Sequence, residues 1–137
     1  MRPSDDQLRS LGGTLREIDP STLQSDPDEG AVRWFLGDNG TEIFAWTHES
    51  DAPHHIQLVF ARVSVEWNRK TGLTTGTFNA SSSTAGGRYD PYLLTVGRQV
   101  DPEVCRAALQ LLSATSIDAK VVRPLARALE EVINPVP

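Results

Sequence analysis

The sequence predicts an α+β domain in which an antiparallel sheet is followed by two C-terminal helices that pack on one of its faces. Three observations lead to this prediction: alternating apolar residues over residues 31–79, an Asn-Gly pair between two such runs, and apolar residues at helical spacing over residues 102–133. Strands followed by helices are typical of an α+β fold with helices on one face. We expect a meander of about four to five strands.

Residues 1–30 form a polar, acidic N-terminal segment that precedes a single domain at 31–137. Ser4 and the glutamine three residues later have the spacing of a capping box, and leucines follow at helical spacing. A Gly-Gly pair in the middle of this pattern lowers the helix propensity by about 2 kcal/mol. The segment is therefore either a marginal helix, or a short helix followed by an extended stretch, and it ends in a loop.

The clearest strand pair lies at residues 31–37 and 41–48, joined by Asp38-Asn39-Gly40. Asn-Gly between alternating apolar runs is the strongest short-range signal of a β-hairpin. Alternation places the following residues on one face of each strand: Val32, Trp34 and Leu36 on the first, Phe44 and Trp46 on the second.

Residues 54–68 leave two interpretations open. Their apolar residues alternate in two sets that are out of phase by one residue near Ala61-Arg62. A strand cannot slip by one residue without turning its face over, so the stretch is either one strand with a bulge or two strands with a tight turn. No Gly, Pro or Asn marks a turn there, which favours the bulge. Further strands are expected at 73–79 and, as an edge strand, at 91–96.

Two helices are expected after residue 100. Asp101 is a good N-cap, and Pro102 suits the first position of a helix at 102–114. Asp118 can cap the second helix. Pro124 interrupts the second pattern, so either the first turn is kinked there or the helix begins near Arg123.

Composition indicates a small acidic protein of the cytoplasm. No apolar run among the 137 residues approaches the ~20 residues of a membrane span, and no secretory signal is visible. A single cysteine fits a reducing compartment. Eleven arginines against two lysines suggest a bacterial source with a GC-rich genome.

The net charge is −5, and lysine and arginine do not cluster along the sequence. Affinity for nucleic acid or anionic membranes rests on many cationic contacts, so neither partner is expected. Acidic residues of the N-terminal segment, Asp26, Asp28 and Glu29, are candidates for docking a basic partner. The alternative is a solvated, poorly ordered terminus.

The stretch THESDAPHH at residues 47–55 holds all three histidines, His48, His54 and His55. In a hairpin, His48 would end one strand and His54 would begin the next, close enough to share a metal ion with an acidic oxygen between them. Such a site could activate water for hydrolysis. The alternative is a solvated turn, and no helical His-x-x-x-His motif is present.

Four other side chains are candidates for chemistry or binding. Cys105 lies near a helix N-terminus, which lowers a thiol pKa, but cysteine is also a common core residue. Trp34, Trp46 and Trp67 belong either to the core or to a binding surface.

No motif of a common catalytic family is present. We therefore expect a non-catalytic protein-binding protein without a cofactor, of adaptor, chaperone-like or immunity type, that presents a sheet face or a helix groove to a basic or apolar partner. A homodimer formed through an uncovered sheet edge would fit this class. The alternative is a small-ligand or metal-binding protein, or a hydrolase, that uses the His48/His54 turn.

Overall fold

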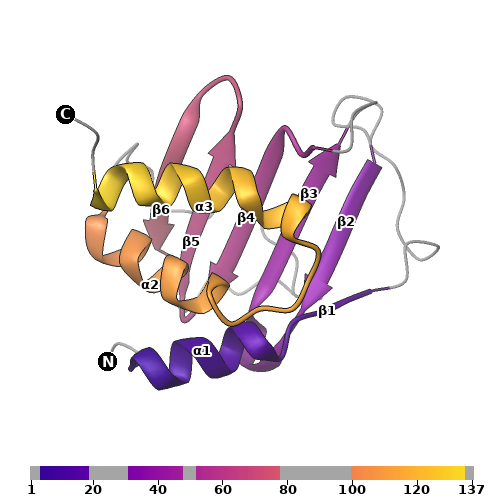
Figure 1. Cartoon of the computed structure of the whole chain (residues 1–137), viewed down its shortest axis with the longest axis vertical. Coiled ribbons are helices and arrows are strands. Elements are labelled where there is room, and N and C mark those ends of the chain that lie inside the picture. Colours follow the sequence, from indigo (N-terminus) through magenta and orange to yellow (C-terminus); the bar gives the residue numbers. More distant parts are fainter. Residues whose placement is uncertain (1–3, 19–30, 48–51, 78–99, 135–137) are drawn as a thin grey trace.

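The computed structural model describes residues 4–18, 31–47, 52–77 and 100–134. The elements follow the chain in this order: α1 (Asp5–Gly13), β1 (Arg16–Glu17), β2 (Ala31–Leu36), β3 (Glu42–Thr47), β4 (His55–Phe60), β5 (Val63–Asn68), β6 (Gly72–Thr77), α2 (Pro102–Leu112) and α3 (Ala119–Ile133). The six strands are antiparallel neighbours in sequence order. Helices α2 and α3 lie across one face of the sheet, and α1 runs along its end (Figure 1).

The predicted α+β meander with two C-terminal helices on one face is confirmed, and the sheet has six strands rather than four to five. One extra strand is the two-residue β1, which pairs with β2. Too short to show a period in the sequence, β1 forms because β2 offers an edge with unpaired backbone groups.

The favoured interpretation of residues 54–68 as one bulged strand is wrong. Two strands, β4 and β5, are joined by the tight turn Ala61-Arg62, and Phe60 pairs directly with Val63. Both turn residues have positive φ, 47° and 66°, as a two-residue hairpin turn of the primed type requires. The phase change in the apolar pattern arises because the residues that flank such a turn face the same side of the sheet.

Helix α1 follows the second interpretation, a short helix and then an extended stretch. The capping box forms: the Gln7 N–H donates to Ser4 Oγ (3.2 Å), and the Ser4 N–H donates to Gln7 Oε1 (2.8 Å). Packing explains the glycine at position 12, because a Cβ there would lie 1.9 Å from the Leu111 carbonyl oxygen of α2. The glycine therefore allows α1 and α2 to pack closely.

Both C-terminal helices begin at their predicted caps. Asp101 Oδ1 accepts from the Glu103 N–H (2.9 Å), and Asp118 Oδ1 accepts from the Lys120 N–H (3.0 Å). Helix α3 begins at Ala119, so a start near Arg123 is wrong. Pro124 lies in its second turn, where the missing N–H removes only one intrahelical bond in a helix anchored by its cap and its buried face.

The register divides the sheet into two faces. The helix-covered face carries the apolar core, illustrated by the aligned cross-strand series Phe35, Ile43, Leu58 and Val65, each at most 1% exposed. Leu8 and Leu15 of the N-terminal region join this core, as do buried residues of α2 and α3.

The opposite face, which we call the aromatic face, carries Trp34, Phe44, Trp46, His55, Glu42, Gln57, Ser64 and Glu66. Phe44 and Trp46 share one face of β3, as the alternation predicts, and the register places Trp34 of β2 on that same face. Among the described residues, every helix lies on or beside the other face (Figure 1).

None of the described helices has the length and apolar character to span a membrane. The edge strand predicted at 91–96 lies outside the described residues.

Candidate functional site

The three tryptophans chosen from the sequence separate onto opposite sides of the sheet. Trp34 and Trp46 lie on the aromatic face, and Trp67 lies on the helix-covered face next to the core. They cannot form one site. Asp26, Asp28 and Glu29 lie outside the described residues, so a docking role for the acidic segment stays a prediction.

The histidine turn is described only in part, because His48 lies outside the described residues. The His54 N–H donates to the Trp46 carbonyl (3.0 Å), and the His54 carbonyl accepts from the Arg69 N–H (2.9 Å), so its backbone closes the end of the sheet. Within the described ranges, no three His, Cys, Asp or Glu side chains group as metal ligands would. The metal hypothesis at His48 and His54 stays a prediction.

Four rings form a continuous row across β2, β3 and β4 on the aromatic face. Trp34 stacks on Phe44 (centroids 5.9 Å, planes 5° apart), and Phe44 stacks on Trp46 (5.9 Å, 21°). Trp46 in turn stacks on the His55 imidazole (4.4 Å, 21°). Such pairs stabilise a sheet beyond the area that they bury. Each ring of the row remains half-buried.

An imidazole–carboxylate pair ends this row. His55 Nε2 lies 2.5 Å from Glu66 Oε2 on β5, and the two side chains are 14% and 32% exposed. Sequence reasoning weighed His48 and His54 and missed His55. A usable signal existed, because His55 precedes Ile56 and so faces away from the core, toward the side of Trp46.

Polar side chains lie buried beside the ring row. Glu42, Gln57 and Ser64 are only 8%, 3% and 2% exposed. Burial raises the pKa of the Glu42 carboxyl above its ordinary value, because a charged group loses its hydration there. Gln57 Nε2 has no hydrogen-bond partner among the described residues. The aromatic face is thus a mixed aromatic and polar surface. Its described ionisable groups are Glu42, Glu66, His55 and, at the β1 edge, the exposed Arg16, which pairs with Leu36.

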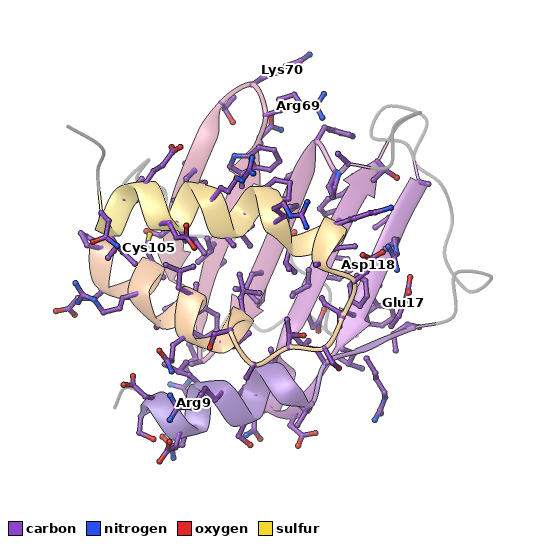
Figure 2. The ribbon with its side chains drawn as sticks, viewed as in Figure 1. Arg9, Glu17, Arg69, Lys70, Cys105 and Asp118 are labelled. Atoms are coloured by element: carbon purple, nitrogen blue, oxygen red, sulfur yellow. The ribbon has the colours of Figure 1, made fainter. Side chains whose placement is uncertain are left out.

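Cys105 is a core residue and not an activated thiol. Its side chain is 0% exposed and lies on the α2–α3 side of the sheet (Figure 2). Burial, with a smaller effect of the Asp101 charge, raises the thiol pKa to about 11. This direction is opposite to the lowering that a helix N-terminus would produce, because desolvation of the thiolate outweighs the dipole here.

Arg33 ties three elements together at the edge of the helix-covered face. It donates to both carboxylate oxygens of Glu17 on β1 (2.8 and 2.7 Å) and to Asp118 Oδ2 at the start of α3 (3.3 Å). Hydrogen bonding to Arg33 lowers the Glu17 pKa, and the Lys120 backbone N–H together with Arg33 lowers the Asp118 pKa. Glu17 and Asp118 face each other across this edge (Figure 2), and the contacts indicate a structural clamp.

A cleft of about 470 Å³ opens between α3 and the sheet end near β5. Its apolar lining includes the half-buried Trp67, and the exposed cations Lys120, Arg123 and Arg127 of α3 line it too. The full lining is Ala52, Trp67, Lys120, Arg123, Pro124, Arg127, Ala128 and Glu131. The sequence contained a signal for it, because cations at i, i+3 and i+7 share one helix face. Looking for cations adjacent in sequence misses this spacing.

Comparison of the chain with protein-family models, curated proteins and solved structures found no match. Function is therefore inferred from the side chains themselves.

Proposed function

We propose that this protein is a non-catalytic protein-binding protein whose aromatic face binds an apolar segment of a partner that also carries basic residues. The stacked row Trp34–Phe44–Trp46–His55 is the observation that carries this proposal. An adaptor, a chaperone-like protein or an immunity-type protein would each use such a face.

The rigidity of the row supports a binding role. Aromatic residues are enriched among the side chains that dominate interface energies. Stacked rings have already lost most of their rotamer freedom, so binding a partner would cost little further entropy. The rings are half-buried rather than sealed in a core, and so retain surface that a partner can cover.

The charges on this face support a partner with basic residues. Glu66 is 32% exposed beside the row, and the whole chain carries −5. An acidic surface speeds encounter with a basic segment, while apolar contact with the rings would hold the complex.

The state of the one cysteine supports a non-catalytic role. Cys105 is buried with a raised pKa and is not a nucleophile.

A selection from a random peptide library on the immobilised protein tests the proposal. We expect one class of recovered peptides to combine apolar with Lys or Arg residues, and to bind faster at low salt than at high salt. Trp46→Ser should lower the affinity of these peptides by about tenfold or more, as truncation of an interface aromatic commonly does.

Trp67→Phe is the matched control, because Trp67 lies on the opposite side of the sheet and keeps an aromatic ring. Its affinity for the selected peptides should stay within about twofold of the wild type, a change of under about 0.5 kcal/mol. Peptides that bind Trp46→Ser as tightly as wild type, or that lose affinity only in Trp67→Phe, would refute this role of the aromatic face.

A further inference from the structure

We propose that the cleft beside α3 is a second binding site, which takes an extended acidic peptide segment. Carboxylates of that segment would pair with Lys120, Arg123 and Arg127, and its apolar side chains would contact Trp67. This site lies on the helix-covered side of the sheet and has the opposite charge to the aromatic face, so it does not depend on the function proposed for that face.

None of the three cations is held in an ion pair in the described part of the chain. Two other arginines do form ion pairs, Arg9 with Asp6 and Arg33 with Glu17. Lys120, Arg123 and Arg127 are exposed, and none of them forms an ion pair with a described residue. Like charges three and four residues apart on a helix repel each other. An anion in the cleft would relieve this repulsion.

The length of the row favours an extended anion over a compact one. With a rise of ~1.5 Å per residue, the three cations are spaced by about 4.5 Å and about 6 Å along α3, a row of ~10 Å. In an extended peptide, side chains on one side repeat every ~7 Å. Two acidic residues at alternate positions therefore span most of the row, whereas a single phosphate would reach only part of it.

The charge around the cleft is strongly positive for an acidic protein. Three cations and Glu131 line it, which gives a local charge of +2 (three minus one). Arg69 and Lys70 extend from the tip of the β5–β6 hairpin beyond α3 (Figure 2). The hydrogen bond from the Arg69 N–H to His54 joins this tip to the loop that supplies Ala52 to the cleft.

The apolar lining gives the site more than charge. Trp67 is half-buried in the cleft with Pro124 and Ala128. A volume of about 470 Å³ is in the range of sites that hold a few side chains or a small ligand. An apolar residue between two acidic ones would cover this lining while its neighbours reach the cations.

The test uses protein labelled with 5-fluorotryptophan, whose three tryptophans give three ¹⁹F resonances. Trp67→Phe assigns the resonance in the cleft by its disappearance. The probe is the acetylated, amidated peptide Glu-Leu-Glu-Leu-Glu, and the same peptide with glutamine in place of glutamate is its control. We expect the glutamate peptide to shift the Trp67 resonance saturably and to bind more weakly at high salt.

Matched double variants separate the site from general charge attraction. The double variant Arg123→Gln with Arg127→Gln should lower the affinity for the glutamate peptide by about tenfold or more. The double variant Arg9→Gln with Arg106→Gln makes the same change in net charge, but on α1 and α2. Its affinity for the glutamate peptide should stay within about twofold of wild type. Should the cleft variant melt earlier, Arg123→Lys with Arg127→Lys keeps both charges and should retain binding.

Four results would overturn this proposal. They are equal affinity for the glutamate and glutamine peptides, shifts confined to the Trp34 and Trp46 resonances, equal weakening by both double variants, or equal affinity for inorganic phosphate. The second result would assign acidic peptides to the aromatic face instead. Loss of binding at the aromatic face would leave the Trp67 resonance responsive, so the two proposals fail separately.

Discussion

The two faces of this sheet are built by the same alternation and have opposite characters. The helix-covered face holds aliphatic side chains at most 1% exposed, such as Ile56, Leu58 and Val65, against the apolar faces of α2 and α3. The aromatic face holds stacked rings with buried Glu42 and Gln57. A fully buried apolar face is suited to packing a core, whereas half-buried rings in a rigid row beside charges are suited to recognition.

Charge separates the two sides as well. Among the described residues, the aromatic face carries two carboxylates, Glu42 and Glu66, with His55 and the edge residue Arg16. The cleft on the other side presents Lys120 and its arginine neighbours. A net charge of −5 conceals this division, because it sums over both surfaces. Partners of opposite charge could therefore bind the same small domain on opposite sides.

The largest effect should come from the helix-covered face. Leu58→Ala removes a fully buried side chain and should cost about 3 kcal/mol of unfolding free energy. Val59→Ala, at the next position on the aromatic face and only half-buried, should cost about 1 kcal/mol or less. Urea unfolding of both variants checks this, and equal losses would show that the two faces are packed alike.

A somewhat smaller loss should follow from crowding the helix layer. Gly12→Ala places a Cβ against the Leu111 carbonyl and should cost about 2 kcal/mol, because α1 and α2 must separate. Gly13→Ala has its nearest contact at 3.9 Å and should stabilise α1 by up to about 1 kcal/mol. Thermal melts of the two variants check that their stabilities change in opposite directions. A loss of stability in Gly13→Ala as large as in Gly12→Ala would contradict the close packing of α1 on α2 at Gly12.

Arg33→Gln tests the clamp at the edge of the same face. About a third of each side chain is exposed, so solvent screening limits the loss of the Arg33–Glu17 pair to roughly 0.5–1 kcal/mol at neutral pH. The folded pKa of Glu17 is lowered, so its contribution is present above the ordinary value of 4.5 and is lost as pH falls through the folded pKa. The free energy of unfolding, measured from neutral to acid pH, should therefore fall less steeply in Arg33→Gln than in wild type. An unchanged dependence of the unfolding free energy on pH would show that Arg33 does not cause the lowered pKa of Glu17.

The smallest effect should come from Glu42 on the aromatic face. Its folded pKa is raised, so wild type should lose stability as pH rises from the ordinary value of 4.5 through the folded value. Glu42→Gln cannot ionise, and should be more stable than wild type at neutral pH without this decline. Urea unfolding measured at a series of pH values checks this difference in stability. Glu130→Gln, at an exposed position, is the control. Equal profiles for the two variants would show that Glu42 is not destabilised by burial.

The parts of the fold that sequence reasoning predicted are those set by local chemistry. Asn39 and Gly40 occupy the left-handed conformations of the first hairpin turn, with φ of 56° and 75°. Ser4, Asp101 and Asp118 cap the three helices through side-chain oxygens that accept from N–H groups two or three residues on. Each of these features needs only neighbours in sequence, so a short window of residues is sufficient to predict it.

Features that depend on which elements meet could not be predicted in the same way. The turn at Ala61-Arg62 lacks the usual glycine or asparagine, and the pairing of β4 with β5 imposes its positive φ angles. Gly12 is explained only by Leu111, nearly a hundred residues further along the chain. The pairing of His55 with Glu66 depends on cross-strand register, which the unmarked turn concealed.

The sequence by itself therefore determined the α+β class, the helix caps, the first hairpin and the sharing of one strand face by Phe44 and Trp46, because alternation and capping are local. Only the tertiary structure decided that Trp67 lies across the sheet from the other tryptophans, and that Lys120, Arg123 and Arg127 meet Trp67 in a cleft. The reason is physical: side-chain direction follows from local periodicity, whereas the surface that faces it is set by the packing of distant elements.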